Sequence, residues 1–102
     1  MAFYHLDGAG THNFSMDESR GILYAAYYNG GVRALNVSGD LSSCSAAEKS
    51  GDGRCDLGRM GRELTYSPFD SGPVYIWGVQ LLAGHVYASD MLNGIWKLAP
   101  VP

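Results

Sequence analysis

The stretch that decides the fold is GTHNFSMDESRGILYAAYYNGGVRALNV, residues 10–37. It contains two apolar segments, 22–28 and 32–37, separated by Asn-Gly-Gly. Asparagine and glycine tolerate the positive φ angles of tight hairpin turns, so this tripeptide predicts a hairpin. The preceding segment 11–16 predicts a further short strand, and the polar residues that follow it predict a turn. The stretch therefore predicts three consecutive antiparallel strands.

These strands are apolar on both faces, which is the informative feature. In residues 22–28 and again in residues 74–82, aliphatic and aromatic side chains occupy both alternating sets of positions. A sheet with one face in water alternates apolar and polar residues instead. Strands of this kind must be covered on both sides, as in a β-propeller, whose four-stranded blades pack between neighbours around a channel.

The chain also matches itself at a shift of 63 residues, which carries Tyr24 onto Tyr87. GILYAAYYNGGVRAL (21–35) then falls on GHVYASDMLNGIWKL (84–98) without a gap. The same shift places Phe14 on Trp77 and Met16 on Val79. Such an internal repeat predicts two copies of one supersecondary unit.

The segments GTHNF, GILYAAYYNGGVRALNVSGDL and GHVYASDMLNGIWKL resemble the LVIVD-repeat class of β-propellers. Members of that class are mostly bacterial secreted or surface proteins. Their strands end near an Asp or Asn, continue into Gly-(Leu/Ile/Val) and a second apolar strand, and finish at a polar corner. The resemblance covers nearly the whole chain. It implies propeller blades of four antiparallel strands and carries no catalytic signature.

The expected organisation is all-β, with one unit of two blades over residues 1–102. Residues 1–10 are expected to supply a strand to a neighbouring blade and then a connection. Blade one is expected over 11–73, with a cysteine-bounded loop at 44–55, and an incomplete blade two over 74–102. The remaining strands are predicted at 2–6, 59–66, 74–82, 85–89 and 94–99.

Two blades cannot close a ring, and their outer apolar faces would be exposed. Exposed apolar patches of that size mark interfaces. A head-to-tail contact that repeats until it meets itself gives closed cyclic symmetry. We therefore expect a homo-oligomer, with six blades from three chains preferred over eight blades from four. The remaining interpretation is a piece of a longer single-chain propeller.

Composition excludes several classes of partner. Apolar residues make up 46% of the chain and charged residues only 17%, which favours a surface covered by a partner. The net charge is −3 and no basic patch is interleaved with aromatic residues, so nucleic-acid binding is not expected. No stretch reaches the roughly 20 apolar residues of a membrane helix, so no membrane span is expected.

The two cysteines flank a polar segment. Cys44 and Cys55 enclose SAAEKSGDGR, which a disulfide would staple by restricting the unfolded loop. A disulfide favours a secreted, periplasmic or cell-surface protein. The alternative is two unrelated thiols in a reduced cytosol.

Four residues are candidate ligand-binding positions: His12, Asn13, Tyr28 and Trp96. His12 and Asn13 are expected near the channel, where three copies of His12 could hold a metal ion such as zinc. The alternative is ordinary hydrogen bonding to backbone or water. Tyr28 and Trp96, together with Tyr27 and Trp77, suit a sugar-binding shelf, although packing between blades explains them as well.

No residue is assigned a catalytic role, and no cofactor is expected apart from the alternative of a channel metal ion. The leading interpretation is a non-enzymatic, self-assembling propeller that acts as a scaffold or binding module for an unidentified ligand. One alternative is a lectin-like ring that binds glycans. The other is a metal-dependent hydrolase or lactonase with a site at the channel mouth.

Overall fold

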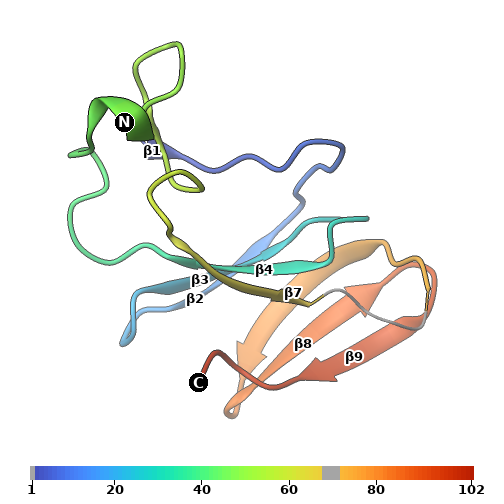
Figure 1. Ribbon diagram of the computed structural model, residues 1–102. Helices are drawn as coiled ribbons and strands as arrows, with labels where there is room; N and C mark the ends of the chain where they lie inside the picture. Colours follow the sequence, from blue (N-terminus) through green and yellow to red (C-terminus); the bar gives the residue numbers. More distant parts are fainter. Residues whose placement is uncertain (1, 68–71) are drawn as a thin grey trace.

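The computed structural model describes residues 2–67 and 72–102 and contains two antiparallel sheets (Figure 1). The first sheet has the order β2-β3-β4-β6 and the second has the order β7-β8-β9. The expectation of an all-β chain is therefore confirmed. The predicted connection over residues 67–73 lies partly outside the described residues. Among those described, no helix is long and apolar enough to cross a membrane.

The strands lie where the apolar segments predict them. The first sheet consists of β2 (Phe14–Asp17), β3 (Ile22–Ala26), β4 (Val32–Asn36) and β6 (Glu63–Ser67). The second consists of β7 (Ile76–Leu82), β8 (His85–Asp90) and β9 (Gly94–Leu98). The segment 22–28 ends as a strand at Ala26, because Tyr28 takes a positive φ of 45° at the turn.

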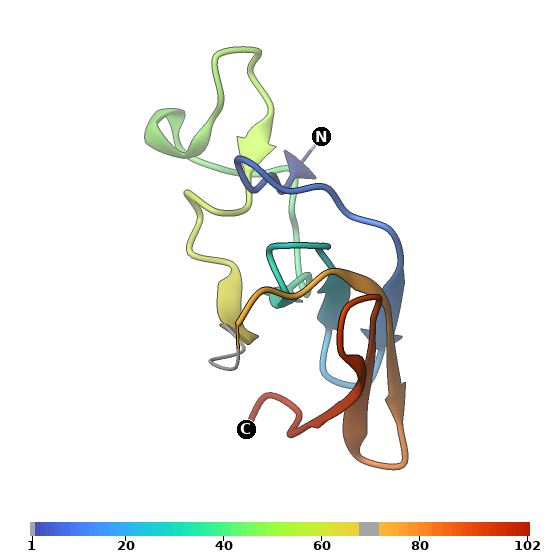
Figure 2. The ribbon, with the colours of Figure 1, turned by 90° about the vertical axis from the view of Figure 1, so that its right-hand side faces the viewer.

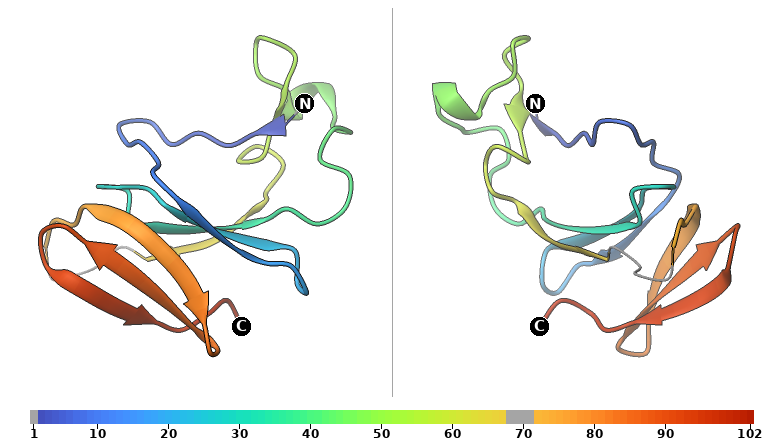
Figure 3. Two further views of the ribbon diagram at one scale, coloured as in Figure 1. Left: turned by 180° about the vertical axis from the view of Figure 1, so that it is seen from behind. Right: turned by 45° about the vertical axis from the view of Figure 1, so that its right-hand side comes forward.

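The two sheets pack face to face and form one apolar core (Figures 1 and 3). We call the packed surfaces the inner faces and the opposite surfaces the outer faces. The inner face of the first sheet carries Ile22, Tyr24, Ala26, Val32 and Ala34. The inner face of the second sheet carries Ile76, Val79, Val86 and Ala88, with Val74 beside them.

The outer face of the first sheet is partly covered by the chain itself. In Figures 1 and 2, the N-terminal segment and the cysteine-bounded loop lie on the side of this sheet away from the second sheet. The Tyr4 and Tyr27 rings meet edge to face at 5.6 Å. The Glu63 carboxylate accepts hydrogen bonds from the Tyr4 hydroxyl at 2.6 Å and the Arg33 guanidinium at 2.8 Å. Ala25, on the outer side of β3, is fully buried, so β3 is covered on both sides as its apolar pattern predicts.

The Cys44–Cys55 disulfide is present, as the sequence predicts. It closes a loop that contains one short 3-10 helix, Ala46–Glu48, and that ends where the two-residue strand β5, Cys55–Asp56, begins. The opening strand β1, Ala2–Phe3, pairs in parallel with β5 of the same chain. This differs from the expected donation of residues 1–10 to a neighbouring blade, which stays a prediction.

The strand registers relate the two sheets. Tyr24 is opposite Ala34, and the residues 63 positions later, Tyr87 and Lys97, are also opposite each other. The innermost strands follow a different shift, because Phe14 is opposite Ala25 whereas Val79 is opposite Ala88.

The ungapped alignment of Phe14 with Trp77 is therefore wrong, and Phe14 corresponds to Val79. Likewise Met16 corresponds to Leu81 rather than to Val79. The physical reason is the length of the turn that follows the innermost strand. Four residues separate Asp17 from its partner Ile22, whereas two residues separate the corresponding pair in the second sheet.

Candidate functional site

Side chains of β2 and the segment before it cap the free edge of β7. The Val79 N–H donates to Asn13 Oδ1 at 2.9 Å, and the Leu81 N–H donates to Ser15 Oγ at 2.9 Å. Both N–H groups point away from β8, because backbone groups alternate along a strand. Asn13 is thus an edge cap between the two sheets, which is a role that its sequence position alone did not indicate.

An aromatic cluster lies at the end of the molecule where β2 and β7 begin. It consists of His12, Tyr28, Tyr75 and Trp77. The His12 and Trp77 ring centroids are 4.1 Å apart, and the Tyr28 and Tyr75 centroids are 4.5 Å apart. The cluster combines two of the predicted site residues with two others. Trp77 was considered as a shelf residue, and Tyr75 was missed because it looked like part of an apolar strand.

Backbone hydrogen bonds hold the cluster in place. Tyr28 and Ile76 exchange both backbone hydrogen bonds, at 3.0 and 2.9 Å, and so join the two sheets at this point. The His12 N–H donates to the Ala26 carbonyl at 3.0 Å. Tyr28 has a φ of 45°, a conformation that is costly for a residue with a side chain. The surrounding hydrogen bonds stabilise this backbone conformation.

An open hollow of about 440 Å³ lies beside the Trp77 ring. His12 is not among the residues that line it, so the hollow uses a part of the Trp77 surface that His12 leaves uncovered. The exposed fraction of Trp77 is 45%. The other lining residues are Ser89, Asp90, Met91, Gly94 and Ile95.

Trp96 has a structural partner in Asp90. Its indole N–H donates to Asp90 Oδ2 at 2.9 Å. Asp90 also accepts hydrogen bonds from Asn93 Nδ2 and from the Tyr75 and Leu92 backbone N–H groups. The side chain of Trp96 packs against the core. Tyr28 is a member of the aromatic cluster, and a sugar-binding shelf that includes Tyr28 and Trp96 stays a prediction.

The charge of Asp90 is stabilised by these four donors. Burial alone would raise the pKa of this carboxyl, because Asp90 is only 5% exposed. Hydrogen bonds from Trp96 and Asn93, and then from the two backbone groups, outweigh burial and lower the pKa to about 2. Asp90 is a buried, ionised carboxylate that the sequence analysis did not single out. The spacing Asp-x-x-Asn-Gly-x-Trp could have indicated it, because it contains two of the side chains that donate to this carboxylate.

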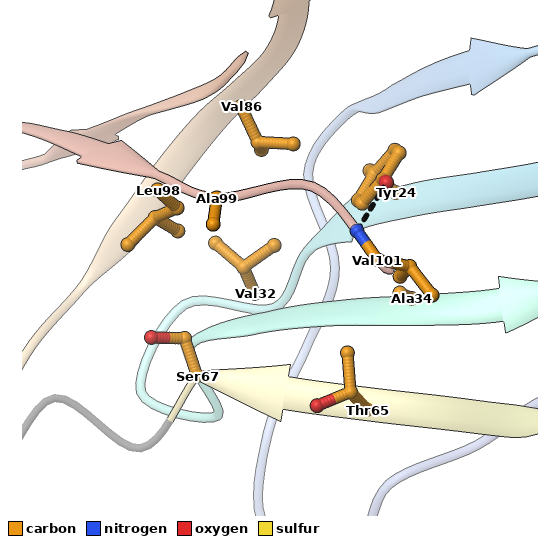
Figure 4. Close-up of a pocket in the computed structure, with 9 residues that line it drawn as sticks. All are labelled: Tyr24, Val32, Ala34, Thr65, Ser67, Val86, Leu98, Ala99 and Val101. Carbon is orange, nitrogen blue, oxygen red and sulfur yellow. Dashed lines mark hydrogen bonds between the residues drawn. The ribbon is translucent and has the colours of Figure 1, made fainter. Parts of the chain in front are cut away.

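A second cavity, of about 250 Å³, lies between the sheets (Figure 4). It is lined mainly by apolar side chains: Tyr24, Val32, Ala34, Thr65, Ser67, Val86, Leu98, Ala99 and Val101. The residues after β9 run along it, and the Val101 N–H donates to the Tyr24 hydroxyl at 3.1 Å. The Arg20 guanidinium holds the Val101 and Pro102 carbonyls at 2.8 and 2.9 Å. None of the described residues that line this cavity is charged.

The described part of one chain contains no group of three or more His, Cys, Asp and Glu side chains placed to hold a metal ion. A site made from His12 of several copies is a different arrangement, and it stays a prediction.

Comparison with known proteins returns no match, whether with protein-family models, with curated proteins or with solved structures.

Proposed function

We propose that the chain is a non-enzymatic, self-associating β-propeller scaffold of the LVIVD-repeat kind, in which each sheet is one blade. One observation carries the proposal. Val79, which is 5% exposed, and the half-buried Leu81 lie between the sheets, whereas the corresponding Phe14 and Met16 are 54% and 42% exposed. A second copy that packs on Phe14 and Met16 would cover them as the first sheet covers Val79 and Leu81.

The contact between the two sheets is of the head-to-tail kind. Tyr24 is on the inner face of the first sheet, but its counterpart Tyr87 is on the outer face of the second. Conversely, Ala88 is on an inner face, but its counterpart Ala25 is on an outer face. Repetition of such a contact with a fixed rotation closes a ring. Three chains would then form six blades, the arrangement that we prefer.

The free edge of β2 supports the same contact. Tyr24 directs its backbone groups to β2, where it is opposite Ser15. Backbone groups alternate along a strand, so the N–H groups of the neighbouring residues Phe14 and Met16 face away from β3. They correspond to the N–H groups that Asn13 and Ser15 cap on β7. Gln80 corresponds to Ser15 in the strand registers. We expect its amide oxygen to accept a hydrogen bond from the Met16 N–H of the next copy.

The contact between chains would be more polar than the contact within a chain. On the outer face of the second sheet, Tyr87 is half-buried, so apolar surface is available. The same face carries Lys97 where the first sheet has Ala34. We therefore expect weaker packing between chains than between the two sheets of one chain.

The second sheet lacks a counterpart of β6, and a strand from another copy could complete it. The 250 Å³ cavity lies between β6 and β9, where such a fourth strand would pack. Donation of residues 1–10 would fill this place, although β1 would first have to leave β5. The ring contact at Phe14 and Met16 does not depend on that donation.

The test is the molar mass in solution, measured by light scattering. We expect a mass near three times the 11.0 kDa of one chain. Met16→Asp should give the single-chain mass, because it places a charge in the contact. Leu92→Asp is the matched control, because Leu92 is 61% exposed on the β8–β9 turn. A well-folded wild-type protein of 11 kDa would refute the proposal.

The disulfide supports an oxidising compartment, and we propose that the protein is secreted, periplasmic or attached to the cell surface. Fractionation of the producing cells, with an antibody against the chain, would test this. Recovery of the protein with reduced cysteines in the cytosol would contradict it.

A further inference from the structure

We propose that the aromatic cluster of His12, Tyr28, Tyr75 and Trp77, with the hollow beside Trp77, binds a neutral glycan by stacking one pyranose ring on the indole. This goes beyond the proposed scaffold function and does not depend on ring closure. The cluster and its hollow are present within one chain, and the strands that form them are held by contacts within that chain.

The exposed rings match the apolar face of a sugar. A pyranose presents C–H bonds on one face and hydroxyl groups at its rim, so it stacks on an aromatic ring while its hydroxyls stay in water. Trp77 is 45% exposed and Tyr75 is 39% exposed. Large aromatic rings supply contact area at low cost in conformational entropy, because they have few rotatable bonds.

The rings are also fixed in position before any ligand arrives. The paired backbone hydrogen bonds between Tyr28 and Ile76 set the position of the Tyr28 backbone. The Tyr75 N–H is held by the Asp90 carboxylate at 2.9 Å. Stacking of His12 on Trp77 restricts the indole. Preorganisation of this kind favours binding, because little freedom remains to be lost.

Tyr28 adds a second argument. Its φ of 45° is a conformation that glycine or asparagine would adopt at a lower cost. Backbone strain of this kind gathers at functional sites, where a particular side chain is needed. Here the strained residue places its ring 4.5 Å from Tyr75 and 6.2 Å from Trp77.

The polar groups around the hollow favour a neutral ligand. Ser89 lines the hollow, and its hydroxyl makes no hydrogen bond to any residue in the described part of the chain. Among the described residues, no Lys or Arg lines the hollow, and the Asp90 carboxylate already accepts four hydrogen bonds. The hollow therefore offers little to a phosphate or to a cation. A hydroxyl group and an uncharged aromatic ring suit a sugar.

The experiment screens the intact chain on an array of neutral glycans, and a responding oligosaccharide is then titrated by calorimetry. We expect Trp77→Ala to weaken binding by about tenfold or more, as for a central aromatic contact. Leu82→Ala is the matched control, because Leu82 is 56% exposed at the opposite end of β7, and it should bind within about twofold of wild type.

Ser89→Ala is a second variant for the glycan titration, and it leaves the aromatic rings unchanged. Ser89 is exposed, so this variant should fold, and we expect binding about three- to tenfold weaker through the lost hydrogen bond. Circular dichroism and light scattering of each sample check folding and molar mass.

Three outcomes would overturn the glycan site. The first is an array without any response. The second is binding that is unchanged in folded Trp77→Ala. The third is a wild type that binds no glycan, together with a Trp77→Ala variant of lower molar mass than the wild type. A second copy of the chain would then occupy the hollow. The scaffold proposal has its own readout, since Met16→Asp tests it without touching the cluster.

Discussion

Replacement of Asp90 by asparagine should destabilise the fold, because it removes a buried carboxylate charge and one of its two acceptor oxygens. Asp90 is 5% exposed and accepts hydrogen bonds from Trp96, Asn93, and the Tyr75 and Leu92 backbone groups. Asparagine is nearly the same size and keeps one acceptor oxygen. Its second position carries an NH₂ group, which would face the Trp96 and Asn93 donors. At least one donor then lacks an acceptor.

The magnitude follows from the pKa of the carboxyl. Its pKa is lowered from 3.8 to about 2 in the folded protein, and each pKa unit corresponds to about 1.4 kcal/mol. The charge therefore contributes about 1–2 kcal/mol near neutral pH once screening by solvent is allowed for. An unsatisfied indole N–H adds about 1 kcal/mol. We expect Asp90→Asn to lower the free energy of unfolding by about 2–3 kcal/mol.

The assay is urea unfolding followed by circular dichroism and fluorescence, at concentrations where both proteins have the same molar mass. With a slope of about 1–1.5 kcal/mol per molar urea, the midpoint should fall by about 2 M. Because the folded-state pKa is depressed, the wild-type advantage is complete above pH 3.8. It is lost as the pH falls through about 2. The gap between the two proteins should therefore narrow from pH 4 to pH 2.

Asp52 is the control. Its pKa is also lowered to about 2, mainly by a hydrogen bond from Ser50 and then by Arg54, but it lies on the exposed cysteine-bounded loop. Solvent replaces those partners on substitution, so Asp52→Asn should have a smaller effect than Asp90→Asn. Equal urea midpoints for wild type and Asp90→Asn at pH 7 would refute the reasoning.

Three further predictions concern other contacts. Asn13→Ala should lower the free energy of unfolding by about 1–2 kcal/mol, because the Val79 N–H loses its acceptor, and urea unfolding measures this. Reduction of the Cys44–Cys55 disulfide should lower it by about 2–3 kcal/mol for a loop of this length, measured with and without reductant. Tyr4→Phe should cost about 1 kcal/mol near pH 7. Burial and a neighbouring carboxylate raise the Tyr4 pKa above 10.0, so wild-type stability from this group is lost as the pH rises past that value, and Tyr4→Phe should not show the loss.

Much of the local structure could be predicted from the sequence because it depends on neighbouring residues. The apolar segments gave strands, and Asn-Gly-Gly gave the β3–β4 hairpin. The prediction that β3 needs cover on both faces agrees with its burial. What covers one of those faces could not be predicted. Tyr4 and Glu63 are 59 residues apart in the chain, and no periodic pattern connects them.

The candidate site shows the same division. His12 and Tyr28 were suspected from their residue types, and they do lie in one cluster. Trp96 was a shelf candidate because it is aromatic. The structure shows that its indole N–H donates to Asp90, and its part in a shelf stays a prediction. The 63-residue shift misaligned β2 and β7, because it assumed equal turns. Only the register of paired strands reveals which residues correspond.

The sequence by itself determined that this chain forms strands and where the hairpins turn, because these depend on local conformational preference and on alternation of side chains. The tertiary structure decided which faces meet, because packing joins residues far apart in the chain. It placed Tyr75 and Trp77 beside Tyr28 and His12, and left Phe14 exposed where its counterpart is buried.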